Sequence, residues 1–195
     1  MSSSAQLLAA VEQLHRSKDA AYGNAWKKRG EVIGVLANLA RKVDRLDSVI
    51  AGAPPTRDES LFDTAVDLFV YGLKYQTFLA DLDTSVAQTL YAGAAIAPPY
   101  SDGPLGFEYL LTGMVPPDGD QVPPVITAAK TVAASFNDVE ACFSLATAVS
   151  DPSVRLARAR ALTVAALILI GSLMYEIPAL YREFIADCER IGHAH

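Results

Sequence analysis

Cysteine and histidine are scarce in this sequence, which has two cysteines and three histidines among 195 residues. Cys142 and Cys188 have neither a CxxC partner nor a histidine cluster beside them, which argues against a zinc site and against a redox pair. We expect both to be buried as small hydrophobic residues. A chain of this length buries roughly 70% of the surface that its unfolded form exposes, so it needs no disulfide or structural metal to hold a core.

Positive charge is also in short supply. Lys and Arg number 16 against 22 Asp and Glu, which gives a net charge of -6 and a pI near 5.0. Binding to a nucleic-acid backbone needs clustered Lys and Arg that displace counterions from the phosphates. We therefore expect no direct nucleic-acid binding. A GxxxxGK[ST] loop is absent too, which excludes P-loop hydrolysis.

Signals for a membrane are missing as well. Residues 1–18 lack the basic start and the uninterrupted apolar stretch of a secretory signal. The longest apolar run, 161–174, has 14 residues, fewer than the roughly 18 to 20 that span a bilayer. We expect a cytoplasmic protein with no membrane partner, in which this run is a buried core helix. The alternative is a membrane-seeking helix anchored by Arg155, Arg158 and Arg160.

Alternating strand patterns are nearly absent, whereas apolar residues three and four apart recur through long Ala- and Leu-rich stretches. This pattern predicts an all-α fold, a bundle of about five main helices. The first predicted helix begins near Ser3 or Ser4, the second runs from about Trp26 or Gly30 to Ile50, and the third runs from about Asp58 to Asp81. The fourth covers 124–149, and the fifth covers 152–190 with a bend or break at Pro178. Thr56 and Glu59 fit a capping box at the start of the third.

The middle of the chain changes character. Residues 93–123 hold several Pro-Pro pairs among Gly and Asp. This composition predicts a linker or lid rather than a packed element, with short helical pieces around 107–111. It divides the chain into a helical region over 1–92 and a C-terminal helical region over 124–195 that packs on the first.

The third predicted helix carries an acidic stripe. Glu59, Asp63 and Asp67 follow one another at intervals of four residues. Around the helix axis they fall within roughly 80° of one another, so they lie on one face. Like charges at this spacing repel, at a cost of a few tenths of a kcal/mol per pair, roughly. A hard divalent cation such as Mg²⁺, or Mn²⁺, bound by the carboxylate oxygens would turn this repulsion into binding.

The preceding helix supplies a second wall for such a site. A short connection makes the two helices antiparallel neighbours, which brings Asp44 near the level of Asp63. Lys42 and Arg45 lie at a similar height, where cations would neutralise the oxygens of a metal-bound polyphosphate. The metal ligands expected on this reasoning are Asp44, Glu59, Asp63 and Asp67. Salt bridging between the helices, such as Asp63 with Arg45, fits the same spacing equally well.

Basic and aromatic residues gather around a predicted break at Gly23. Tyr22 and Trp26 flank this break and would offer aromatic faces to a base. Lys18 and Arg29 are close enough in the sequence to contact the phosphates of the same nucleotide. A core position for Trp26 and a solvated face for the basic residues fit the same pattern.

Four blocks of the sequence together resemble a known family. They are KDAAYGNAW at 18–26, RGE at 29–31, RKVDRL at 41–46 and DESLFDTAVDL at 58–68. Their order and separations are similar to those of the nucleotide modification associated domain, a MazG-like branch of the all-α nucleoside triphosphate pyrophosphatases. The resemblance covers about residues 15–80.

This resemblance implies an activity and a setting. It implies Mg²⁺ held by helix carboxylates and cleavage of a (deoxy)nucleoside triphosphate to monophosphate and pyrophosphate, with Glu59 and Asp63 as catalytic residues. It also implies homo-oligomers and a link to phages or phage defence. The family's strict ExxE motif is replaced by a DxxD at Asp44 and Asp47. The alternative is therefore a catalytically inactive nucleotide sensor or a helical scaffold protein.

A two-helix site leaves an apolar flank that another helix pair must cover. Two sources of this cover are open at the level of sequence. A second copy of the chain would supply it in a homo-oligomer, and residues 124–190 would supply it within one chain.

Overall fold

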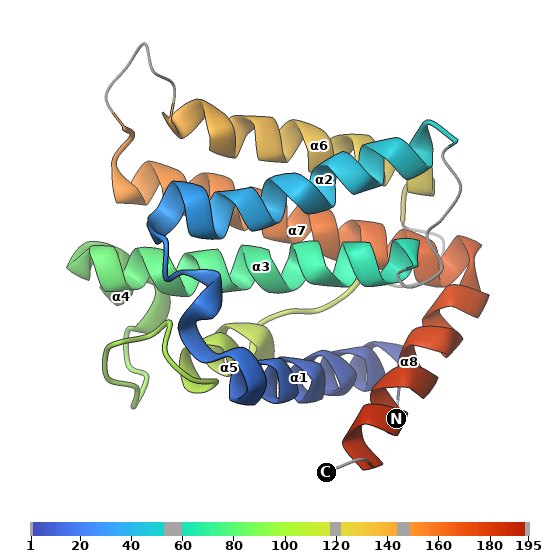
Figure 1. The fold of residues 1–195 in the computed structure, drawn as a ribbon, viewed down its shortest axis with the longest axis horizontal. Coiled ribbons are helices and arrows are strands. Elements are labelled where there is room, and N and C mark those ends of the chain that lie inside the picture. Colours follow the sequence, from blue (N-terminus) through green and yellow to red (C-terminus); the bar gives the residue numbers. More distant parts are fainter. Residues whose placement is uncertain (1, 53–59, 118–121, 144–148, 194–195) are drawn as a thin grey trace.

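A computed structural model describes residues 2–52, 60–117, 122–143 and 149–193. In these residues the chain forms eight α-helices and no strand, so the all-α prediction is confirmed (Figure 1). The α-helices are α1 (Ser3–Tyr22), α2 (Ala37–Ile50), α3 (Leu61–Leu82), α4 (Thr84–Tyr91), α5 (Leu105–Thr112), α6 (Val125–Glu140), α7 (Pro152–Glu176) and α8 (Pro178–His193). Short 3-10 turns η1 (Gly23–Trp26) and η4 (Ala141–Phe143) and a π-helical turn η2 (Glu31–Leu36) join them.

Local signals set most of the helix ends. The Ser2 side chain caps α1 by accepting from the Ala5 N–H, one or two residues before the predicted start. The predicted interruption at Pro178 is confirmed, because α7 ends and α8 begins there. The predicted capping box of Thr56 and Glu59 lies outside the described residues.

The core is built around α3, which runs through the middle of the molecule with α7 packed along it (Figure 1). Fourteen of the 22 residues of α3 are buried, including Phe62, Phe69 and Leu73. The two helices approach closely at Gly72, where a Cβ would lie 2.6 Å from the Thr163 Oγ1 atom. Because Gly72 has no side chain, the backbones of α3 and α7 can approach each other here.

Helices α6 and α7 cover α2 and α3 from within the chain. Helix α2 packs on both α3 and α6, and α6 packs along α7. The C-terminal region thus covers part of the apolar flank of α2 and α3, and it was one of the two sources that the sequence left open.

The proline-rich middle segment is packed in part. Phe107, Leu110 and Leu111 of α5 are buried in the core, and α5 contacts α1 and α3. The backbone N–H groups of Tyr100 and Ser101 donate to the carboxylate of Asp81 on α3. The expectation of an unpacked linker is wrong for this part, because prolines mark breaks in regular structure but carry no information on burial between the breaks.

Helix α7 is longer than the apolar run that marks it in the sequence. It has 25 residues, a mean hydropathy of 1.7 over its most apolar window, and 67% of that window is buried inside the fold. By length and composition alone it is the one helix in the described parts of the chain that would reach across a membrane. Most of its apolar surface is instead turned toward α3 and α6.

Candidate functional site

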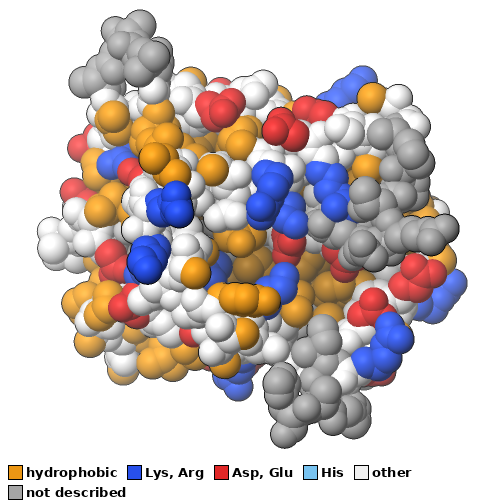
Figure 2. All heavy atoms as spheres, viewed as in Figure 1, with side chains coloured by type: hydrophobic (Ala, Val, Ile, Leu, Met, Phe, Trp, Pro, Cys, Tyr) orange, Lys and Arg blue, Asp and Glu red, His pale blue; other side chains and the backbone are white. Residues whose placement is uncertain are grey.

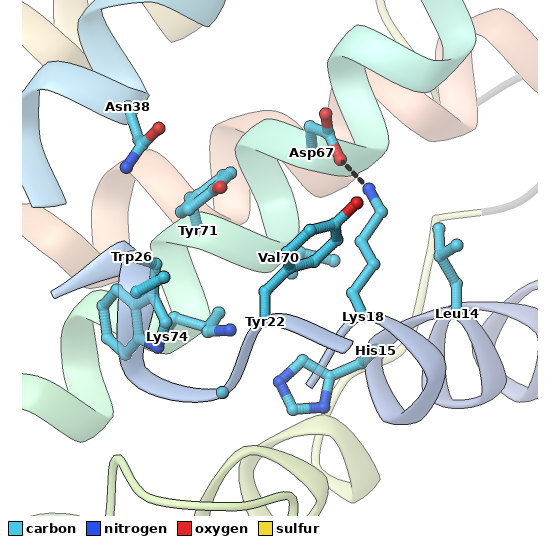
Figure 3. Close-up of a pocket in the computed structure, with 12 residues that line it drawn as sticks. Leu14, His15, Lys18, Tyr22, Trp26, Asn38, Asp67, Val70, Tyr71 and Lys74 are labelled. Carbon is cyan, nitrogen blue, oxygen red and sulfur yellow. Dashed lines mark hydrogen bonds and ion pairs between the residues drawn. The ribbon is translucent and has the colours of Figure 1, made fainter. Parts of the chain in front are cut away.

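A pocket of about 290 Å³ opens between α1, η1 and α3. Figure 2 shows a hollow on this face, with a hydrophobic floor and basic side chains around it. Its lining side chains come from four elements (Figure 3). They are Leu14, His15, Lys18 and Tyr22 of α1, Ala25 and Trp26 of η1, Asn38 of α2, and Asp67, Val70, Tyr71 and Lys74 of α3.

The break after α1 shapes one end of the pocket. Helix α1 ends at Tyr22, and Gly23 has a φ of 48°, a left-handed conformation that glycine adopts without steric cost. The η1 turn then carries Trp26 inward, where its ring packs edge-on against Phe78 and is 8% exposed. Tyr22 remains at the surface, 73% exposed. The predicted break is confirmed, and it separates a buried aromatic residue from an exposed one.

Lys74 is a cation held in an apolar setting. Its Nζ atom lies 4.8 Å from the centre of the Trp26 ring, a cation-π distance. The pKa of Lys74 is lowered to about 8, chiefly by burial; Asp19 opposes this shift, and the positive charges of Lys18 and Lys27 contribute to it. The ammonium is therefore easily deprotonated for a lysine.

His15 is a buried residue of the pocket lining. It is 3% exposed and stacks on Phe107 of α5, with ring centres 3.7 Å apart and planes 7° from parallel. Burial, and then the charge of Lys74, lower the pKa of His15 to about 4 against an opposing effect of Glu108. Its Nδ1 atom has no hydrogen-bond partner among the described residues, and neither has Nε1 of Trp26.

Asp67, a predicted metal ligand, lines the pocket but is paired with two lysines. The Nζ atom of Lys42 lies 2.6 Å from its Oδ2 atom, and the Nζ atom of Lys18 lies 3.1 Å from its Oδ1 atom. The Asp67 and Lys42 side chains are only 16% and 11% exposed. The salt-bridge interpretation of the acidic stripe thus describes Asp67, with Lys42 and Lys18 as its partners.

Asp63, predicted as a metal ligand and catalytic residue, caps its own helix. Its Oδ2 atom accepts from the Ser60 N–H at 2.8 Å and from the Ser60 hydroxyl at 2.7 Å, and the Asp63 N–H donates to the Ser60 Oγ atom at 3.1 Å. This is a reciprocal capping box at the start of α3. The box lies one turn further along the chain than the predicted box of Thr56 and Glu59.

The other predicted site residues lie apart from the pocket or outside the description. Asp44 and Arg29 are exposed, and Arg45 is half-buried on α2. Glu59, predicted as both catalytic residue and metal ligand, lies outside the described residues. Within the described ranges no three His, Cys, Asp or Glu side chains form a group able to hold a metal ion. The structure therefore does not bring Asp44, Asp63 and Asp67 together as the ligand set that the sequence predicted.

No family model matches this chain, and no solved structure matches it. Among curated proteins, it is similar to the Gene 30 protein of Bacillus phage SP01, with 30% identity. The match covers 38% of this chain and 43% of the phage protein. The chain therefore spans less than half the length of that relative.

Four polar residues of the pocket lining are absent from the sequence prediction: His15, Asn38, Tyr71 and Lys74. A signal for three of them was present. Tyr71 and Lys74 follow Asp67 at i+4 and i+7 and thus continue its face of α3. His15 precedes Lys18 by three residues on α1 in the same way. Four of the predicted residues do line the pocket, and they are Lys18, Tyr22, Trp26 and Asp67.

Proposed function

We propose that the protein binds a nucleotide in the pocket between α1 and α3. The observation that carries this proposal is the combination of Lys18 and Lys74 with the aromatic rings of Tyr22 and Trp26 in one cavity. Ammonium groups pair with phosphate oxygens, and an aromatic ring stacked on a base contributes about 1 to 3 kcal/mol. The cavity volume of about 290 Å³ is close to the lower limit of small-molecule sites.

The charges around the pocket favour an anionic ligand. Lys18 and Lys74 line the pocket, and Lys42 adjoins it through its ion pair with Asp67, the one acidic side chain among the described lining residues. This local excess of positive charge contrasts with the net charge of -6 for the whole chain. A cleft with one sign of charge and apolar walls concentrates ligands of the opposite sign.

The proposed ligand is a (deoxy)nucleoside triphosphate, and the proposed activity is its hydrolysis to monophosphate and pyrophosphate. Support comes from the four sequence blocks that resemble the nucleotide modification associated domain, because residues from three of them line or adjoin one pocket. The described carboxylates do not fit a Mg²⁺ site, so we assign no step to a metal. The similarity to a phage protein agrees with a phage-linked role.

A nucleotide sensor without turnover is the second candidate. It is favoured by the contacts of Asp63 and Asp67, because one carboxylate caps a helix and the other is held by two lysines. Neither carboxylate is poised to orient a water molecule in this arrangement. Both candidates require nucleotide binding and differ in whether product appears.

Trp26 provides a direct probe of binding, because it is the only tryptophan in the chain. The experiment is a titration of purified protein with each nucleoside triphosphate, monophosphate and free nucleoside, followed by Trp26 fluorescence in Mg²⁺ and in EDTA. Chromatography of the same mixtures detects monophosphate. We expect saturable quenching by nucleotides and weaker quenching by nucleosides.

A matched pair of lysine variants localises the binding. Lys18→Met removes a pocket cation, whereas Lys130→Met removes an exposed lysine of α6 outside the pocket. Weaker binding is expected for the first variant alone. Product with binding supports the hydrolase, and binding without product supports the sensor. Absence of quenching by every nucleotide would refute both.

A further inference from the structure

We propose that the phosphate of the ligand enters the inner end of the pocket and is bound there by Lys74, with the base at the mouth beside Tyr22. This inference rests on the proposed nucleotide binding and specifies the orientation of the ligand. Exposure distinguishes the two ends. Trp26 and His15 are 8% and 3% exposed, whereas Tyr22 is 73% exposed.

The inner end contains buried nitrogen atoms without partners. Nε1 of Trp26 and Nδ1 of His15 are enclosed, and neither has a hydrogen-bond partner in the parts of the chain that the structure describes. Both residues line the pocket. Buried polar atoms of folded proteins are almost always hydrogen-bonded, so two such atoms on residues that line one cavity indicate a place for a ligand group.

Lys74 brings an ammonium group to the same end. Across the described ranges no carboxylate lies within ion-pair distance of its Nζ atom, which faces the ring of Trp26 instead. Figure 3 shows the Lys74 side chain extending from α3 beside Trp26. The other lysine of the pocket, Lys18, is paired with Asp67, so Lys74 is the cation that has most to gain from an anion.

The donors at this end select a phosphate over a base. An ammonium group and an indole N–H only donate hydrogen bonds, and neutral His15 donates from one ring nitrogen. The edge of a nucleobase presents donors beside acceptors, so these donors would face some groups that repel them. A phosphate presents only acceptor oxygens. Its negative charge would also give the Lys74 ammonium an ionic partner.

The mouth of the pocket suits a base. Tyr22 projects there from the end of α1, and Tyr71 lies across from it on α3 (Figure 3). Phenol rings stack on any base, because every base has a π face. A base at the mouth and a phosphate at the inner end place the ribose between them.

The test measures the affinities of inorganic phosphate, a deoxynucleoside monophosphate and the matching nucleoside by isothermal titration calorimetry. Lys74→Met is expected to weaken binding of phosphate and of the monophosphate by about tenfold or more, and to leave nucleoside binding unchanged. Tyr22→Ala is expected to weaken binding of the monophosphate and the nucleoside, and to leave inorganic phosphate unchanged. Because Tyr22 is exposed, this variant tests the orientation even if Lys74→Met does not fold.

The outcomes separate this inference from the proposed function. Unchanged affinity of the monophosphate for Lys74→Met, with binding by the wild type intact, would overturn the orientation and leave nucleotide binding standing. Loss of phosphate affinity in Tyr22→Ala would also overturn it, because the base and phosphate ends would then be reversed. A wild type that binds no nucleotide would refute the proposed function itself.

Discussion

The Asp67 carboxylate of α3 lies 2.6 Å from the Lys42 ammonium of α2, and this ion pair joins two neighbouring helices beside the pocket. Lys18 of α1 approaches the other carboxylate oxygen at 3.1 Å, so one side chain connects three helices. Asp67 thereby holds two lysines in position around the pocket. This role differs from that of a metal ligand, and the two roles have opposite consequences for stability.

Asp67→Asn is expected to destabilise the fold. The substitution removes the Asp67 charge from the Lys42 ammonium in a site where both side chains are largely buried, and breaking such a pair costs on the order of 3 kcal/mol. Urea denaturation in EDTA measures the free energy of unfolding. A free energy that stays equal or rises would instead indicate relief of repulsion along an acidic stripe.

The matched control for this variant is Asp138→Asn. Asp138 of α6 pairs with Arg158 at 3.4 Å, but both side chains are at least half exposed. Exposed ion pairs contribute little to stability, so its denaturation curve should overlay that of the wild type. Mg²⁺ should leave the difference between Asp67→Asn and the wild type unchanged.

Ser60→Ala and Asp63→Ala are each expected to lower the free energy of unfolding by about 1 kcal/mol, since both remove the capping box of α3. The double variant should lose less than the sum of the two, because one box is lost in every case. Denaturation curves of the four proteins form the cycle. Strictly additive losses of unfolding free energy would contradict a reciprocal box. If Asp63→Ala lost nucleotide binding while Ser60→Ala bound normally, Asp63 would regain a role as a ligand-binding residue.

Stability should rise with pH in the alkaline range because of Lys74. Its pKa falls from 10.5 to about 8 in the folded chain, so between these values the unfolded chain binds a proton that the folded chain does not. Lys74→Met removes this dependence, so its free energy of unfolding should exceed that of the wild type at about pH 7. At about pH 9.5 the difference between the two proteins should be smaller. Thermal denaturation at both pH values tests it. An advantage that is constant with pH would contradict the prediction.

Stability should fall in mild acid because of His15. Its pKa drops from 6.5 to about 4 on folding, so the unfolded chain gains a proton first as the pH decreases. The loss begins near pH 6.5 and is complete below about 4, and it amounts to about 3 kcal/mol at most. The slope of unfolding free energy against pH should be shallower for His15→Gln than for the wild type. Equal slopes would assign the acid sensitivity to other groups.

Several features of the site were readable from periodicity. Asp67, Tyr71 and Lys74 share a face of α3, as residues at i, i+4 and i+7 do on any helix. His15, Lys18 and Tyr22 share a face of α1 for the same reason. The sequence prediction followed the acidic residues toward the start of α3 and missed the lysine and tyrosine further along, because it sought ligands for a metal.

The helices and their breaks were determined by the sequence itself. Apolar spacing, the glycine at Gly23 and the proline at Pro178 act within a few residues through backbone geometry. The partners of the carboxylates were decided by the tertiary structure. Lys18 and Lys42 reach Asp67 only because α1 and α2 pack on α3, and that packing depends on apolar area summed over segments far apart in the chain. The burial of His15 against Phe107, 92 residues away, has the same origin.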